Sequence, residues 1–214
     1  MLDQVAEIDS EAAACHPILR HAASSLEYSR VWALGSPAIL DAPLLGFLCS
    51  ERCPGNIVLA AYDLARVLRD TGVPIAGGFH SPMERECLDL LLRGTQPIVI
   101  CPARTIMPMR MPRRWRDCVR AGRGLIISPF APTARSPTAA LAAVRNRFVA
   151  MLSRHLFVVH AAPGGRLEAL CREWIAMNRE VLALSDEANA HLSALGVTLT
   201  TPDGLLLRLG AEQQ

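Results

Sequence analysis

We predict an α/β fold for this chain: a three-layer, Rossmann-like arrangement with a mostly parallel sheet of about six or more strands flanked by helices. Two observations predict it. Short apolar runs recur along the chain with helical patterns between them, and several of these runs lead directly into glycine-rich loops. Continuous apolar runs are typical of strands buried on both faces of a parallel sheet. With 214 residues and 51% hydrophobic content, the chain is long enough to bury such a core as one domain.

Six apolar runs have the length expected of buried parallel strands. They are Val31–Leu34, Val73–Ala76, Ile98–Cys101, Leu125–Ile127, Leu156–Val159 and Val181–Leu184. The segments between them fit helices. Ile57–Asp70 keeps an apolar face and is followed by Gly72, a residue type common at helix ends. Pro82 suits the first turn of a second helix, which we expect to end near Arg93.

The domain organisation follows from these elements. Residues 31–196 are predicted to form the Rossmann-like domain, and residues 1–30 an N-terminal arm or helix that leads to its first strand. Residues 197–214 are predicted to form a C-terminal tail or hairpin, because Asp203-Gly204 between apolar residues is a turn signal. No internal repeat or low-complexity linker divides the chain.

Charge and cysteine content exclude several classes of function. The net charge of +2 gives no general affinity for nucleic acid, so any basic surface is local. All 22 basic residues are arginine. The absence of lysine excludes a Walker-type phosphate loop and Schiff-base chemistry. The seven scattered cysteines, with no signal peptide and no long apolar span, predict a cytoplasmic protein with reduced thiols and no metal site.

Glycine loops follow three of the predicted strands. These loops contain Gly35-Ser36, Gly77-Gly78 and Gly164-Gly165. In an open parallel sheet, ligands bind beyond the carboxyl ends of the strands, so we expect the three loops to share one edge. Backbone N–H groups at a glycine turn and at a helix N-terminus favour an anion. The sequence therefore predicts a phosphate-binding edge, although each glycine pair taken alone also fits a tight turn.

Charged side chains accompany these loops. Arg145 and Arg147 lie two residues apart on a predicted helix and point to different faces, so one of them is expected to clamp the phosphate. The alternative for either arginine is an ordinary ion pair. Glu168 falls in the first turn of the helix after Gly165. It is either a general acid or base, or a carboxylate that stabilises the helix N-terminus.

The expected binding residues belong to the strand-end loops and to the helix that precedes the strand Leu156–Val159. They are Gly35, Ser36, Gly77, Gly78, Phe79, His80, Ser81, Arg145, Asn146, Arg147, Gly164, Gly165 and Arg166. A further segment, Pro102–Arg123, crowds methionine and arginine around Trp115. It is either a nucleic-acid contact or a solvated basic face, and the second interpretation is favoured.

The order of these motifs resembles the DNA-processing protein A (DprA/Smf) family, whose central domain is an extended Rossmann fold. The Arg145-Asn146-Arg147 helix with its following apolar strand is the most specific match. The resemblance implies binding of single-stranded DNA or a nucleotide phosphate at the strand-end loops, a homodimer, and transfer of the strand to a RecA-type recombinase during DNA uptake or recombination. It implies no bond-breaking chemistry, no cofactor and no membrane association.

Two alternatives stay open. Pro163-Gly164-Gly165 with Glu168 also resembles part of the signature of LOG-type nucleoside-monophosphate phosphoribohydrolases, which belong to the same superfamily. That resemblance implies an enzyme that cleaves an N-glycosidic bond, with Glu168 and Arg147 as its catalytic candidates. The other alternative is a nucleotide-sensing module without chemistry.

Overall fold

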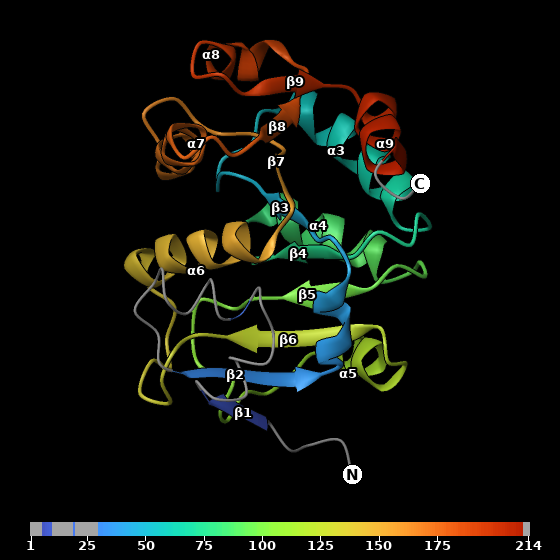
Figure 1. Ribbon diagram of the computed structural model, residues 1–214, viewed down its shortest axis with the longest axis vertical. Helices are drawn as coiled ribbons and strands as arrows, with labels where there is room; N and C mark the ends of the chain where they lie inside the picture. The colour runs from blue at the N-terminus through green and yellow to red at the C-terminus, as the bar shows by residue number, and fades with distance from the viewer. Residues whose placement is uncertain (1–5, 10–18, 20–29, 212–214) are drawn as a thin grey trace. The chain divides into compact units, whose positions relative to one another are not determined.

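The structure, a computed structural model, describes residues 6–9, 19 and 30–211 (Figure 1). Strands and helices alternate along the chain, which confirms the α/β Rossmann-like fold and its mostly parallel strands. The chain divides into two compact units. Unit 1 consists of Met1–Gly46, Pro74–Phe79 and Pro97–Arg154, and unit 2 of Phe47–Val73, His80–Gln96 and His155–Gln214. None of the described helices has both the length and the apolar character needed to cross a membrane.

The described part of unit 1 contains five strands. Their order in the sheet is β1 (Ala6–Asp9), β2 (Arg30–Gly35), β6 (Gly124–Ser128), β5 (Ile98–Ile100) and β4 (Ile75–Gly77). Strands β4, β5 and β6 are parallel, whereas β1 and β2 run antiparallel to their neighbours. The described helices of this unit are η1 (Pro37–Asp41), α5 (Arg113–Arg120) and α6 (Ala139–Leu152).

The direction of β2 corrects one prediction. Gly35 pairs with Leu125 at the start of β6, and Trp32 pairs with Ser128 at its end, so β2 and β6 point in opposite directions (Figure 1). Gly35-Ser36 therefore lies at the amino edge of the parallel strands, and its expected place beside the Gly77-Gly78 loop is wrong. The apolar run showed that β2 is buried, but burial on both faces does not depend on strand direction.

Unit 2 contains a second set of parallel strands. These are β7 (His155–Val158), β8 (Val181–Leu184) and β9 (Thr198–Thr200). Strand β3 (Leu45–Leu48) ends in this unit, where the Leu48 carbonyl accepts a hydrogen bond from the Val159 N–H at 2.9 Å. The helical elements are α3 (Gly55–Leu68), α4 (Pro82–Leu91), α7 (Arg166–Ala176), η2 (Glu187–Asn189), α8 (Ala190–Ser193) and α9 (Pro202–Ala211).

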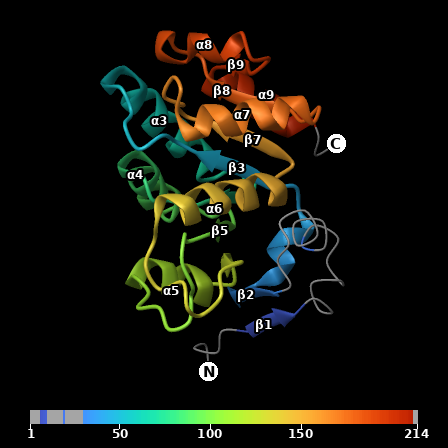
Figure 2. The ribbon, with the colours of Figure 1, turned by 90° about the vertical axis from the view of Figure 1, so that its left-hand side faces the viewer.

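Aromatic and aliphatic side chains fill the core of unit 2. The rings of Phe47 and Phe157 stack with their centroids 6.1 Å apart, and Trp174 of α7 is buried. Helices α3 and α4 pack side by side (Figure 2). The N-terminus of α4 carries a capping box: Ser81 accepts a hydrogen bond from the Glu84 N–H, and Glu84 accepts one from the Ser81 N–H. The predicted helix start at Pro82 is confirmed.

Two further predictions are corrected in unit 2. Strand β3 was not predicted, because Gly46 interrupts its apolar run. The C-terminal hairpin is wrong, because Asp203-Gly204 lies in the first turn of α9 and not in a turn between strands. Strand β9 pairs in parallel with β8 at this point of the chain, and the next residues form a helix that packs against α3.

Gly35 lends itself to a direct test of the β2–β6 pairing. Its φ is +116°, and a Cβ at this position would overlap with the carbonyl oxygen of Gly124. We expect Gly35→Ala to lower the free energy of unfolding by about 2 kcal/mol or more, because backbone strain and a steric clash add together. Gly72→Ala is the matched control, since Gly72 also has a positive φ, +76°, but open space around it. Urea denaturation of both variants measures the difference, and equal losses would contradict the antiparallel contact.

Candidate functional site

The predicted binding residues fall in both units. Unit 1 contains Gly35, Ser36, Gly77, Gly78, Phe79, Arg145, Asn146 and Arg147, whereas unit 2 contains His80, Ser81, Gly164, Gly165, Arg166 and Glu168. In unit 1, Gly35 and Ser36 lie apart from the other predicted binding residues. The Ser36 N–H donates to the Gly124 carbonyl at 3.1 Å, at the amino edge of the parallel strands. Gly77, Gly78 and Phe79 lie at and just after the end of β4, and the Arg145 side chain reaches Gly78.

The loop after β4 holds the guanidinium of Arg145. A Cβ at position 78 would overlap with the Arg145 Nη1, so only glycine leaves room for this side chain. Phe79, the next residue, has a φ of +47°. This left-handed conformation costs a non-glycine residue about 1 kcal/mol, and such strain is concentrated at functional sites. The backbone of the loop is thus shaped around the arginine.

Arg145 is a buried cation without an acidic partner. Its side chain comes from α6, and the residue is only 3% exposed. Nη1 lies 3.5 Å from the carbonyl oxygen of Cys101, which is a long hydrogen bond, and Nε is buried with no hydrogen-bond partner. Among the described residues, no carboxylate pairs with it. The neighbouring Asn146 Oδ1 is also buried without a partner, whereas Arg147 is exposed.

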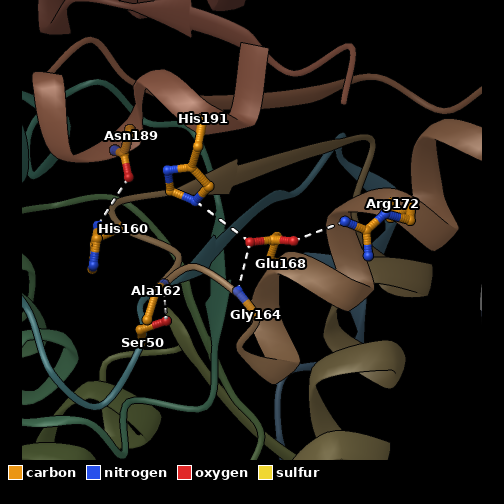
Figure 3. A network of polar contacts seen from close by, with 8 residues as sticks. All are labelled: Ser50, His160, Ala162, Gly164, Glu168, Arg172, Asn189 and His191. Atoms are coloured by element: carbon orange, nitrogen blue, oxygen red, sulfur yellow. Dashed lines mark hydrogen bonds and ion pairs between the residues drawn. The ribbon is translucent and has the colours of Figure 1, made fainter. Parts of the chain in front are cut away.

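The glycine loop of unit 2 is occupied by a carboxylate. The Gly164 N–H donates to Glu168 Oε2 at 2.8 Å, and Arg172 donates to Oε1 at 2.8 Å (Figure 3). His191 Nε2 lies 3.7 Å from the same Oε2. The Gly164 N–H in the first place, and Arg172 after it, lower the pKa of Glu168 below its usual range. Glu168 therefore stays ionised and stabilises the start of α7, which disfavours a role as general acid.

A second carboxylate occupies the N-terminus of α4. Glu84 Oε2 accepts hydrogen bonds from the N–H groups of His80 and Ser81, at 2.8 and 3.1 Å. Its other oxygen accepts from the Cys49 N–H at 2.9 Å. The N–H groups of His80, Ser81 and Gly164 are thus engaged by acidic side chains, and the Gly165 N–H donates to the Ala162 carbonyl at 2.9 Å.

The loop that follows β3 was not among the predicted site segments. The Ser50 N–H donates to the carbonyl of His160 at 2.8 Å, and the Ser50 Oγ accepts from the Ala162 N–H at 2.9 Å (Figure 3). The loop after β3 is therefore hydrogen-bonded to the loop after β7. Its signal was present in the sequence, because the apolar run of β3 leads through Cys49-Ser50 to Pro54-Gly55 at the start of α3.

The residues that the structure describes show no place for a metal ion. Within residues 6–9, 19 and 30–211, no three His, Cys, Asp or Glu side chains are grouped as a metal site requires. The described cysteines are free thiols, and burial raises the pKa of the Cys101 thiol, near Arg145, to about 12. This thiol is protonated at neutral pH, so it adds no negative charge to the surroundings of Arg145.

The role of Glu168 predicts a specific pH dependence. Because its pKa is lowered on folding, its contribution to stability is present above the unfolded pKa of about 4.3 and is lost as the pH falls through the folded value. We expect Glu168→Gln to cost about 1 kcal/mol at pH 7 and less at pH 3, measured by urea denaturation. Glu51→Gln, at an exposed position, is the control. A loss of equal size at both pH values would exclude the ionised cap.

The chain is similar to known proteins in sequence and in fold. The model of the DNA recombination-mediator protein A family matches residues 19–201. No curated protein matches the sequence. DNA processing protein A from Streptococcus pneumoniae has a similar fold, with a TM-score of 0.74 and 16% identity over 96% of this chain and 75% of that one.

Two other solved structures are also similar. DNA processing protein A from Helicobacter pylori, a structure concerned with a unique single-stranded DNA binding mode, has a TM-score of 0.62 and 17% identity over 86% of this chain and 80% of that one. The molybdenum cofactor carrier protein of Chlamydomonas reinhardtii has a TM-score of 0.54 and 15% identity over 79% of this chain and 97% of that one. At such identities these likenesses show the fold. The family model matches residues 19–201, which are most of this chain, and this match shows that the chain belongs to the DNA recombination-mediator protein A family.

Proposed function

We propose that this protein binds single-stranded DNA through the phosphate backbone, and that Arg145 with the Gly77-Gly78 loop of unit 1 holds one phosphate. The buried guanidinium of Arg145 carries this proposal. Transfer of a charge out of water costs several kcal/mol unless an opposite charge and hydrogen bonds compensate for it. Among the described residues the only compensation is one long hydrogen bond to a carbonyl. A phosphate oxygen would provide both the missing charge and a partner for Nε.

Arginine suits this role for geometric reasons. Its planar guanidinium presents several N–H donors that match the oxygens of a phosphate. Gly78 lets the backbone come close to the guanidinium, so the loop itself also lies within reach of a bound anion. Family membership and the single-stranded DNA binding described for the Helicobacter pylori relative support DNA as the source of the phosphate.

The electrostatics of unit 2 favour the same assignment. Glu84 and Glu168 accept the hydrogen bonds of the loop amides there, and two carboxylates repel an anion. Within the part of the chain that the structure describes, unit 1 has a cation without an acidic partner at its glycine loop, whereas the glycine loop of unit 2 has a carboxylate. The phosphoribohydrolase and nucleotide-sensor alternatives are not favoured, since Glu168 is engaged in stabilising a helix and the family is one of DNA-processing proteins.

The remaining expectations from the family belong to the same proposal. The protein would act in the cytoplasm as a homodimer and transfer the DNA strand to a RecA-type recombinase. Light scattering of the purified protein, with and without a single-stranded oligonucleotide, measures the dimer. A mass of one chain at every concentration tested would exclude the dimer without affecting the assignment of Arg145.

Arg145→Met tests the phosphate site. We expect affinity for a labelled oligonucleotide to fall by about 10-fold or more, because a charge-assisted hydrogen bond is lost. The slope of log affinity against log salt should flatten by about 0.7, the value for one phosphate contact on a single strand. Stability should stay equal or rise, because an apolar side chain of similar length replaces an uncompensated buried charge.

The combination of lower affinity and retained stability separates binding from a structural role. Arg66→Met is the matched control, since Arg66 is exposed and paired with Asp63 at 2.9 Å. It should leave both affinity and salt slope unchanged. If Arg145→Met binds DNA as the wild type does, or if the wild-type protein binds no single strand at low salt, the proposed function is wrong.

A further inference from the structure

His160 is a nearly buried histidine at the carboxyl end of β7. The residue is 4% exposed, and its Nδ1 lies 2.9 Å from Asn189 Oδ1 (Figure 3). Asn189 comes from the segment between β8 and α8 and is itself fully buried. If Asn189 Oδ1 is the acceptor in this pair, Nδ1 of the imidazole carries the proton. The other hydrogen bonds of Asn189 decide whether its oxygen or its nitrogen faces His160.

Both amide hydrogens of Asn189 are already used. Its Nδ2 donates to the carbonyl oxygens of Val159 at 2.9 Å and of Leu184 at 3.0 Å. The amide orientation is fixed by these two bonds, so Oδ1 faces His160 and acts only as an acceptor. Nδ1 of His160 therefore carries the proton in the neutral ring, and Nε2 has a free lone pair.

The Nε2 atom of His160 retains some exposure. Among the described residues it has no hydrogen-bond partner, and it is not fully enclosed by protein atoms, although the residue as a whole is only 4% exposed. In Figure 3 the far edge of the ring points away from Asn189. Burial lowers the pKa of His160, so the ring is neutral at pH 7 and Nε2 accepts hydrogen bonds.

We propose that His160 Nε2 accepts a hydrogen bond from an N–H group of a nucleobase in the bound DNA strand. The site needs a ligand that donates a hydrogen bond and carries no negative charge there, because Nε2 is an acceptor and the carboxylate of Glu168 contacts His191 beside it. Amino and ring N–H groups on the edges of unpaired bases meet both conditions, whereas phosphate oxygens meet neither. This subsite rests on the proposed binding of single-stranded DNA.

Two oligonucleotides of equal length distinguish base from backbone contacts. One is oligo-dC, and the other is an abasic strand with the same number of phosphates. We expect His160→Phe to weaken binding of oligo-dC by about 3- to 10-fold, the value of one hydrogen bond, and to leave binding of the abasic strand unchanged. His160→Gln keeps an acceptor and should restore most of the affinity for oligo-dC. Arg145→Met should weaken both strands.

The outcomes separate this inference from the proposed function. Equal weakening of both strands by His160→Phe, or no weakening of either, would overturn the base contact while DNA binding stands. If the wild-type protein binds neither strand, both proposals are wrong. His155→Gln is the control, because His155 lies at the opposite end of β7 and contacts Glu180. The ¹⁵N spectrum of His160 gives a second readout: oligo-dC should shift Nε2 and the abasic strand should not, and shifts from both would overturn the contact.

Discussion

The guanidinium of Arg145 occupies the space that any side chain at position 78 would fill. This contact joins α6 to the loop after β4, and the left-handed conformation of Phe79 belongs to the same loop. A cation is thereby held at the carboxyl edge of unit 1 with one long hydrogen bond and no acidic partner among the described residues. Burial of this charge costs free energy, and a bound phosphate would offset that cost. The proposed function follows from that imbalance.

In unit 2, side chains of the protein itself accept the hydrogen bonds of the loop amides before two helices. At the starts of α4 and α7, a glutamate in the first turn accepts the hydrogen bonds of the preceding loop. Such carboxylates favour the helix N-terminus, and they also exclude an anion from it. A glycine loop before a helix is therefore not sufficient evidence for phosphate binding. The deciding feature is whether a side chain of the same protein has already taken the place of the ligand.

His160 shows how a buried hydrogen-bond network defines one open atom. Asn189 uses both amide hydrogens on backbone carbonyls, which leaves its oxygen to orient the imidazole. The outer nitrogen is then a fixed acceptor with no protein partner among the described residues. Arg145 provides a donor with positive charge in unit 1, and His160 provides a neutral acceptor in unit 2. Each matches one chemical component of a nucleic acid: phosphate in the case of Arg145, and a base in the case of His160.

The sequence by itself determined the fold class, most of the buried strands and the start of α4, because apolar periodicity and capping residues act locally. It also indicated Arg145 and the Gly77-Gly78 loop as candidate residues of one binding site. The direction of β2, the existence of β3 and the helix at the C-terminus were decided only by tertiary structure. Strand direction and pairing depend on partners far away in the chain, and a run of apolar residues carries no record of them. Likewise, the residue type at positions 84, 168 and 189 shows what each side chain can bond to, but only the folded chain decides which donors it meets.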